Sequence, residues 1–203
     1  MAYKSMRDTL DELASHGMKV FRVSDAAKVM GKSSAYASKL LSSNKQAERI
    51  ERGVYYIKGT MPSMYEISSQ IVFPSYVSCF AAMQFHGLAE QSVIAYTVIT
   101  IKRHKPIELM GSKIEFVTVA RNRFFGYRKY GSAYIATAEK TIVDSLYLRT
   151  PPLPYVSEAL EKALRSKLIT AKTLMRFASK MGSKKVMAQI SVLLKANAAD
   201  LKM

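Results

Sequence analysis

Hydrophobic positions near the N-terminus follow helical and extended spacing in turn. The apolar residues Met6, Leu10 and Leu13 recur at helical intervals and predict a first helix, residues 5–16. Shorter patterns then predict an extended piece at 20–23, a helix at 26–30 capped by Ser24 or Asp25, a helix at 33–43, and a hairpin of 47–50 and 54–57 around Arg52-Gly53. This order is typical of a winged helix-turn-helix, so we predict that fold for residues 1–60.

The third predicted helix, residues 33–43, has a slim outer face. Ala37 and Leu41 would face the core, which turns small residues such as Ser34 and Ser38 outward. A DNA major groove about 12 Å wide admits one α-helix, and basic residues around the hairpin suit the flanking phosphates. Alternatively, the serines only let two helices pack closely. The candidate DNA-binding residues are Lys32, Ser33, Ser34, Tyr36, Ser38, Lys39, Ser42, Lys45, Arg49 and Arg52.

The pattern changes after Gly59 and Pro62, which interrupt regular structure and mark a boundary. The later patterns predict a helix at 63–71, a strongly apolar helix at 76–86, strands at 94–102, 113–120, 122–131 and 132–136, a helix from Thr137, and three helices at 156–168, 170–181 and 184–197. We therefore predict an α/β (α+β) chain. A winged helix-turn-helix domain (1–60) precedes a mixed α+β domain (61–150) and a C-terminal helical segment (151–203) that packs on it.

The charge balance indicates a polyanionic partner. Lys and Arg number 31 against 15 Asp and Glu, a net charge of +16 in 203 residues. Such an excess attracts nucleic acid, an anionic membrane surface or an acidic protein, although it can also be a solvated basic surface. In the strand-rich part, aromatic residues interleave with basic ones, a mixture that can hold phosphates and stack bases. Alternatively, these aromatics are half-buried strand residues. This second candidate nucleic-acid surface comprises Lys102, Arg103, Lys105, Arg121, Arg123, Arg128 and Lys129.

The cysteine and histidine residues indicate which disulfides and metal sites the chain could form. The single cysteine, Cys79, cannot form an internal disulfide; it indicates a cytoplasmic protein, and its place on the apolar helix predicts a core residue. His16, His86 and His104 are isolated, so we expect no metal site, and no cofactor-binding motif occurs. The N-terminus lacks the apolar core of a signal peptide, and no apolar run approaches the roughly 18–20 residues of a membrane span.

A metal-dependent nuclease is the enzymatic alternative. Lys113 and Glu115 fall on one face of a predicted strand, and some nucleases place two carboxylates and a lysine on neighbouring strands. Strands often alternate charged and apolar residues only because one face is wet. Glu139 and Asp144 are five residues apart on a predicted helix, a poor spacing for sharing a metal. We therefore expect no enzymatic activity.

Several segments, in order, resemble one known family. They are RGVYYIKG at the end of the winged helix, PSYVSCFAAMQFHGL, TVITIKR, IEFVTV, GYRKYGSAYIATAEKTIVDSL and LRSKLITAKTL. Together they cover nearly the whole chain, which is similar to the AbiEi antitoxins of type IV toxin–antitoxin and phage-abortive-infection systems. The resemblance implies DNA contact at Ser33–Ser42 and Arg49–Arg52, and it carries over no catalytic residue.

The resemblance also implies a biological role. Members of the family repress their own operon by binding inverted repeats at the promoter, which suits a homodimer on double-stranded DNA. They also counter a nucleotidyltransferase-like toxin. The competing interpretation is a winged-helix transcription regulator whose second domain senses a ligand or forms a dimer. A toxin gene beside this one would distinguish the two.

Overall fold

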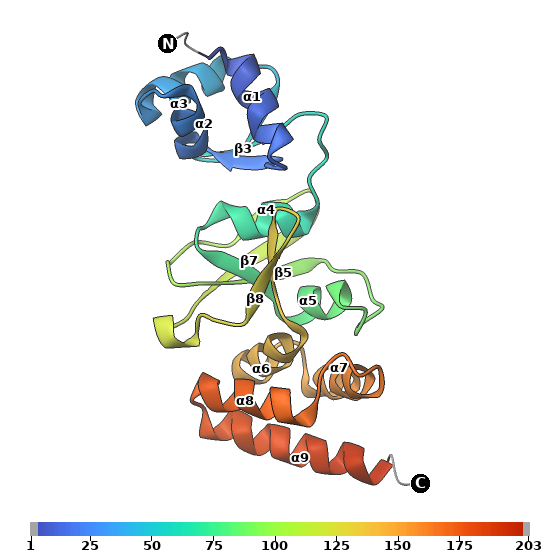
Figure 1. Cartoon of the computed structure of the whole chain (residues 1–203). Coiled ribbons are helices and arrows are strands. Elements are labelled where there is room, and N and C mark those ends of the chain that lie inside the picture. The colour runs from blue at the N-terminus through green and yellow to red at the C-terminus, as the bar shows by residue number, and fades with distance from the viewer. Residues whose placement is uncertain (1–3, 201–203) are drawn as a thin grey trace. The chain divides into compact units, whose positions relative to one another are not determined.

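The computed structural model describes residues 4–200, which form two compact units (Figure 1). The first unit runs to Phe73 and also contains Lys129–Ala133, and the second contains Pro74–Arg128 and the chain from Tyr134 onward. The chain therefore passes between the units three times. The division into domains at residues 60 and 150 stays a prediction.

The first unit contains the winged helix-turn-helix. Its elements are α1 (Met6–Ser15), β1 (Val20–Arg22), α2 (Val23–Met30), α3 (Ser34–Ser43), β2 (Ala47–Glu51), β3 (Val54–Ile57) and α4 (Met64–Ile71). The strands pair antiparallel in the order β1-β3-β2, with β2 and β3 forming the wing hairpin. Leu10, Phe21, Leu41 and Tyr55 are almost fully buried in its core. The predicted winged helix is confirmed.

The start of α2 differs from the prediction. The helix begins at Val23 rather than Ala26, so Asp25 lies in its first turn instead of capping it. The carboxylate of Asp25 accepts a hydrogen bond of 2.8 Å from the backbone N–H of Arg22. A carboxylate at this third helical position satisfies a free backbone donor as an N-cap would, which explains the three-residue difference between the predicted and the observed start of the helix.

The second unit contains most of a mixed six-stranded sheet and five helices in the described part of the chain. Strand order is β6-β7-β5-β4-β9-β8, with β4 antiparallel to β5 and β5 parallel to β7. Its elements are β4 (Ser75–Ser78), α5 (Cys79–Phe85), β5 (Ala95–Thr100), β6 (Ile107–Leu109), β7 (Ser112–Thr118), the 3₁₀ turn η1 (Arg121–Arg123), β8 (Tyr127–Tyr130, its last two residues in the first unit), β9 (Ala133–Ala136), α6 (Ala138–Leu148), α7 (Leu153–Arg165), α8 (Ala171–Met181) and α9 (Lys184–Asp200). The α+β class is confirmed.

The apolar helix predicted at 76–86 is wrong in its first part. Residues 75–78 form β4, and Val77 pairs with Val98 on one side and Ile135 on the other. A short apolar run buried on both faces has the same pattern in a strand as in a helix, so periodicity could not separate them. The chain turns directly into α5 at Cys79, which is fully buried as predicted. The strand predicted at 122–131 is likewise shorter, because η1 occupies its start.

The C-terminal helices surround a second apolar core. Ile142, Leu160, Leu174 and Ile190, from α6, α7, α8 and α9, are all fully buried there. The three predicted C-terminal helices are confirmed, although α7 begins at Leu153, just after the proline-rich break. Proline is tolerated in the first turn of a helix, where its missing N–H has no partner to lose.

Candidate nucleic-acid interface

The outer face of α3 is exposed and built from small residues. Ser33 caps the helix by accepting a hydrogen bond of 3.3 Å from the backbone N–H of Tyr36. Ala37 and Leu41 are buried against the rest of the winged helix. The opposite face is exposed and consists of Ser34, Ala35, Ser38, Lys39 and Ser42. A helix with such a face can lie deep in a major groove without steric hindrance.

The serine hydroxyls on α3 are not equivalent. The Ser42 hydroxyl donates a hydrogen bond of 2.7 Å to the backbone carbonyl of Lys39, and Ser33 is used as the cap. Ser34 and Ser38 make no side-chain hydrogen bond within residues 4–200. Their hydroxyls are therefore free to donate to or accept from a base edge. Beside them, the Lys32 ammonium lies 5.8 Å from the ring of Tyr36, whose side chain is about half exposed.

The wing presents basic residues at its edge and its tip. Lys45, Arg49 and Arg52 are exposed, and the strand register shifts between Arg49 and Glu51. Arg49 Nε donates a hydrogen bond of 3.1 Å to the carbonyl of Glu51, which holds this guanidinium close to the hairpin. Gly53 at the tip has φ of +81°, a conformation that other residues rarely adopt. The tight turn therefore leaves Arg52 at the end of the wing.

Acidic residues limit the positive charge of the wing. Glu48 lies 3.7 Å from the ammonium of Lys58, and its hydrogen bond raises the pKa of the Tyr56 hydroxyl. Lys39 on α3 and Arg52 at the wing tip are exposed and form no ion pair within residues 4–200. The best-placed cations for phosphate contact are therefore Lys39 on the helix and Arg52 at the wing tip.

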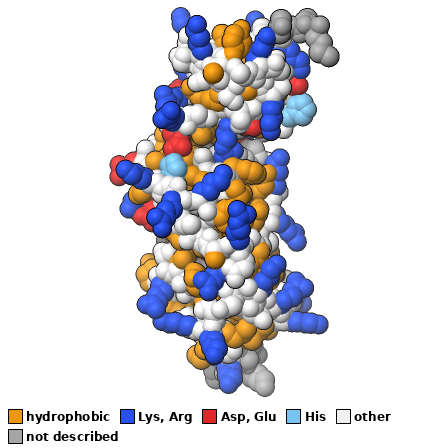
Figure 2. Space-filling view, turned by 90° about the vertical axis from the view of Figure 1, so that its left-hand side faces the viewer, with side chains coloured by type: hydrophobic (Ala, Val, Ile, Leu, Met, Phe, Trp, Pro, Cys, Tyr) orange, Lys and Arg blue, Asp and Glu red, His pale blue; other side chains and the backbone are white. Residues whose placement is uncertain are grey.

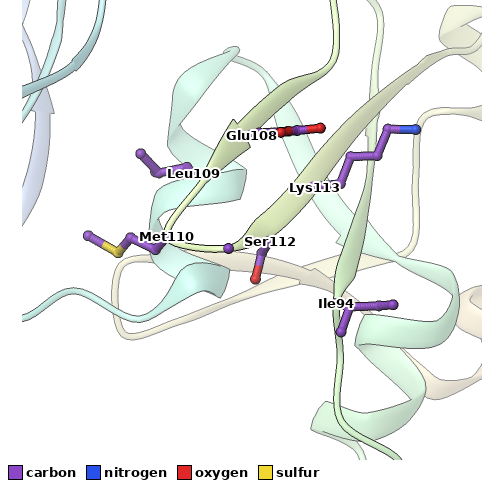
Figure 3. Close-up of a pocket in the computed structure, with 7 residues that line it drawn as sticks. Ile94, Glu108, Leu109, Met110, Ser112 and Lys113 are labelled. Atoms are coloured by element: carbon purple, nitrogen blue, oxygen red, sulfur yellow. The ribbon is translucent and has the colours of Figure 1, made fainter.

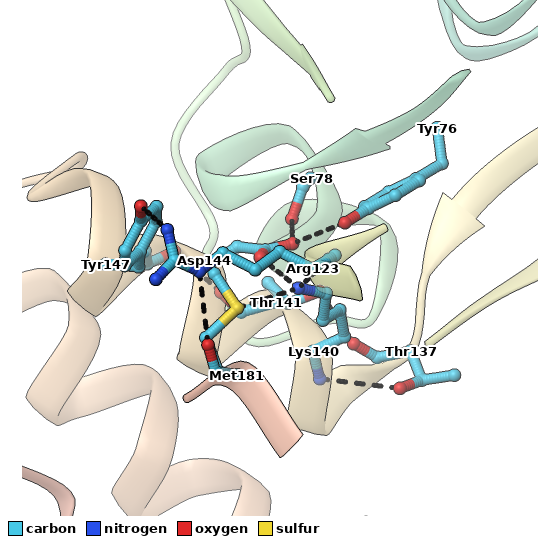
Figure 4. Close-up of polar contacts among 10 residues, drawn as sticks. Tyr76, Ser78, Arg123, Thr137, Lys140, Thr141, Asp144, Tyr147 and Met181 are labelled. Carbon is cyan, nitrogen blue, oxygen red and sulfur yellow. Dashed lines mark hydrogen bonds and ion pairs between the residues drawn. The ribbon is translucent and has the colours of Figure 1, made fainter. Parts of the chain in front are cut away.

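Most residues of the second predicted surface are exposed, but one of them makes hydrogen bonds inside the protein. Lys102, Arg103, Lys105, Arg121, Arg128 and Lys129 are exposed, and Lys129 belongs to the first unit while the others belong to the second. Arg123 differs: its Nη1 donates to the Tyr147 hydroxyl at 2.5 Å and its Nε donates to the Met181 carbonyl at 3.2 Å (Figure 4). Its guanidinium therefore fixes η1 to α6 and α8.

The aromatic residues among these basic ones are mostly packed inside the protein. The ring of the buried Tyr76 lies 5.2 Å from Phe124 and 4.8 Å from Tyr127 between centroids. Phe125 lies 5.8 Å from Phe177. These contacts favour half-buried strand residues over a base-stacking platform. Nucleic-acid binding by the exposed cations of this region stays a prediction.

A buried polar cluster lies beneath this region, and sequence reasoning missed it. The ammonium of Lys140 lies 2.6 Å from Asp144 Oδ1, and Asp144 Oδ2 accepts hydrogen bonds of 2.9 Å from Ser78 and 3.2 Å from Tyr76 (Figure 4). Lys140 and Asp144 are at most 1% exposed. Burial raises the pKa of Asp144, although the Lys140 ammonium and the hydrogen bonds oppose it. A substrate in solvent cannot reach this pair, so we interpret it as structural.

The residues considered for nuclease chemistry include an exposed pair on β7 and the buried pair of α6. Lys113 and Glu115 share a strand face as predicted and form an exposed ion pair of 2.6 Å. His86 Nε2 lies 2.7 Å from the carbonyl of Ala136, and burial lowers the pKa of His86. Within residues 4–200 no group of three or more His, Cys, Asp or Glu side chains could hold a metal ion.

A surface pocket of about 410 Å³ lies at the β6–β7 turn. Figure 3 shows Leu109 and Met110 pointing to one side of the hairpin, and Glu108 and Lys113 to the other. Ile94 and Met110 on its rim are 75% and 64% exposed. Small-molecule sites combine apolar walls with a few converging polar groups. The side chains here diverge, so the pocket gives the ligand-sensing alternative no specific support.

The first unit thus has the architecture of a winged-helix protein in which one face of α3 is exposed and built from small residues. Residues 8–58, which run from α1 to just past β3, match a family described as transcriptional regulator, AbiEi antitoxin. The predicted resemblance to this family is confirmed over those residues. No curated protein matches the chain. Among the helices of residues 4–200, none is both long and apolar enough to cross a membrane.

Proposed function

We propose that the protein is a DNA-binding repressor that serves as the antitoxin of a type IV toxin–antitoxin system. The observation that carries the proposal is the exposed face of α3, which lies in a segment similar to AbiEi transcriptional regulators. The protein would act in the cytoplasm, repress its own operon and counter a nucleotidyltransferase-like toxin. No catalytic step is part of this role.

In the proposed complex, α3 enters the major groove. Ser34 and Ser38 reach base edges with their free hydroxyls, and Lys39 and Arg52 bind phosphates on either side of the groove. A homodimer would place two such helices on the inverted repeats of the promoter, because the symmetry of a dimer matches that of a palindromic site. Phosphate contacts position the protein, and the serine contacts select the sequence.

Promoter binding by a double variant tests this proposal. The full-length Lys39→Ala/Arg52→Ala protein is titrated onto a fluorescent duplex covering the region upstream of its own gene, at several salt concentrations. Each lost phosphate contact should lower the slope of log affinity against log salt by about 0.9, so the slope should fall by about 1.8. Lys162→Ala/Arg165→Ala on α7 removes the same charges from residues that pair with Glu90 and Glu161. Equal slopes for wild type and the Lys39/Arg52 variant would contradict the proposed interface.

A further inference from the structure

The C-terminal helices carry a concentration of positive charge that the proposed interface does not use. No acidic residue lies between Glu161 and Asp200, whereas nine basic ones do. They are Lys162, Arg165, Lys167, Lys172, Arg176, Lys180, Lys184, Lys185 and Lys195. Lys and Arg side chains are spread over the face drawn in Figure 2, while Asp and Glu appear at few places. The sequence pattern of these helices therefore calls for an explanation of its own.

On α8 the cations form a row. Lys172, Arg176 and Lys180 follow one another at intervals of four residues, which places them on one side of the helix about 6 Å apart. All three are exposed, while Leu174 and Ala178 on the opposite side are buried against the neighbouring helices. Lys184 and Lys185 then open α9, the next helix (Figure 1). We call Lys172, Arg176 and Lys180 the α8 row.

The α8 row has no acidic partners within residues 4–200. On α7, by contrast, Arg165 lies 2.6 Å from Glu161 and Lys162 lies 3.2 Å from Glu90. Like charges four residues apart destabilise a helix. Lysines in the first turns of α8 and α9 also oppose the helix dipole, and neither first turn has an acid. Lys180 does lie 4.5 Å from the centre of the Phe125 ring and in the last turn of α8, where the helix dipole favours a cation. The fold gives no such reason for Lys172 and Arg176, whereas a bound polyanion would stabilise them.

We propose that the α8 row binds the sugar–phosphate backbone of double-stranded DNA, independently of base sequence. A linear array of cations matches the linear array of charges on a duplex strand. Single-stranded binding sites add exposed aromatic rings for base stacking, but Phe177, the aromatic residue of α8, packs on Phe125 instead. Protein interfaces depend on buried apolar anchors, and no large hydrophobic side chain of α8 is exposed. The inference rests on the proposed DNA-binding function and assigns it a second, non-specific contact.

A charge-matched pair of full-length variants tests the row. Lys172→Gln/Arg176→Gln removes two unpaired cations, and Lys162→Gln/Arg165→Gln removes two paired ones from α7. Affinity for a duplex without the promoter sequence is measured between about 50 and 200 mM salt. The first variant should lower the salt slope by about 1.8, since each neutralised phosphate contributes about 0.9, and the second should leave it close to wild type.

The result separates this inference from the proposed function. A slope equal to that of wild type in Lys172→Gln/Arg176→Gln, or an equal loss in the α7 control, would overturn the α8 row. Thermal unfolding verifies that both variants are folded, and these exposed residues are not needed for the core. If the row is correct, its loss should be the same on promoter and non-promoter duplexes. Failure of the winged-helix proposal would instead appear as a normal promoter slope in Lys39→Ala/Arg52→Ala.

Discussion

At the scale of single residues, the buried pair of Lys140 and Asp144 requires particular residues around it. The Lys140 ammonium also donates to the carbonyl of Arg123 at 3.0 Å and lies 4.3 Å from the ring of Phe125. A Cβ atom at Gly126 would lie only 2.7 Å from Phe177, so this close approach requires glycine. Together these contacts join η1, α6 and α8, and they suggest that the pair fixes one arrangement of those elements.

Removing one charge of the pair should destabilise the protein strongly. Asp144→Ala leaves the Lys140 ammonium buried without its counter-charge, which we expect to lower the free energy of unfolding by about 3–5 kcal/mol. Denaturant unfolding measures the change, and Asp11→Ala, at an exposed position of α1, provides the control. Lys140→Met/Asp144→Leu should lose less than the single variant, because it buries no lone charge. An Asp144→Ala protein as stable as the Asp11→Ala control would contradict this role.

Glu66 gives the first unit a pH-dependent contribution to stability. Its carboxylate accepts hydrogen bonds from the hydroxyl of Ser132 at 2.6 Å and the backbone N–H of Ser63 at 2.8 Å, and it lies 3.7 Å from the Lys19 ammonium. Partial burial raises the pKa of Glu66, but the hydrogen bonds and Lys19 outweigh it and hold the pKa below its usual 4.5. The carboxylate is thus bound more favourably in the folded than in the unfolded state.

The Glu66→Gln variant should reveal that contribution. Since the folded pKa is lowered, the stabilisation is fully present above about pH 4.5 and is lost as the pH falls through the folded pKa. Wild type should therefore be more stable than Glu66→Gln at pH 7, with the difference shrinking below pH 4.5. Thermal unfolding at a series of pH values measures it. Glu158→Gln, exposed on α7, is the control, and a pH-independent difference for Glu66→Gln would refute the assignment.

At the scale of elements, the proposed complex uses different side chains for sequence selection and for salt dependence. Ser34→Ala/Ser38→Ala removes the two free hydroxyls but no charge, so we expect altered preference among promoter variants at an unchanged salt slope. Binding to a panel of duplexes with single base-pair changes measures the preference, where one lost contact is worth about 1–3 kcal/mol. Ser42→Ala should have little effect, because that hydroxyl already bonds to Lys39. Identical preferences for wild type and the double variant would mean that other groups read the bases.

The sequence predicts elements well where local signals agree. The slim face of α3 and the wing turn at Gly53 both follow from neighbouring residues. β4 could not be recognised, because its burial between β5 and β9 depends on pairing with residues 98 and 135. The Arg123 and Lys140–Asp144 contacts are equally non-local, since they join η1 and α6 to Met181. Local patterns thus predicted α3 and the wing but not the polar contacts that fix the second unit.

At the scale of the whole molecule, the two units are connected by more than one linker. The chain leaves the second unit after Arg128, contributes residues 129–133 to the first unit, and returns to the second unit at Tyr134. Within the first unit, Ser132 bonds to Glu66 at 2.6 Å, and its carbonyl accepts from Gln70 at 2.7 Å. Cutting the chain after the wing would keep these bonds but would separate α4 from Arg22, which donates to the Gln70 carbonyl, and from Lys19, which pairs with Glu66. Functions of the two units are better separated by point variants of the full chain than by fragments.

The full-length Lys39→Ala/Arg52→Ala protein can separate repression from toxin neutralisation. It should no longer silence its promoter, because its phosphate contacts are lost, yet it should still rescue cells that make the cognate toxin if the second unit carries the antitoxin activity. Driving the toxin from an unrelated promoter is essential, since repression would otherwise imitate neutralisation. Cell survival and a promoter reporter measure the two functions side by side. Loss of rescue in this variant, shown to be folded, would instead tie neutralisation to DNA binding and favour a plain transcription regulator.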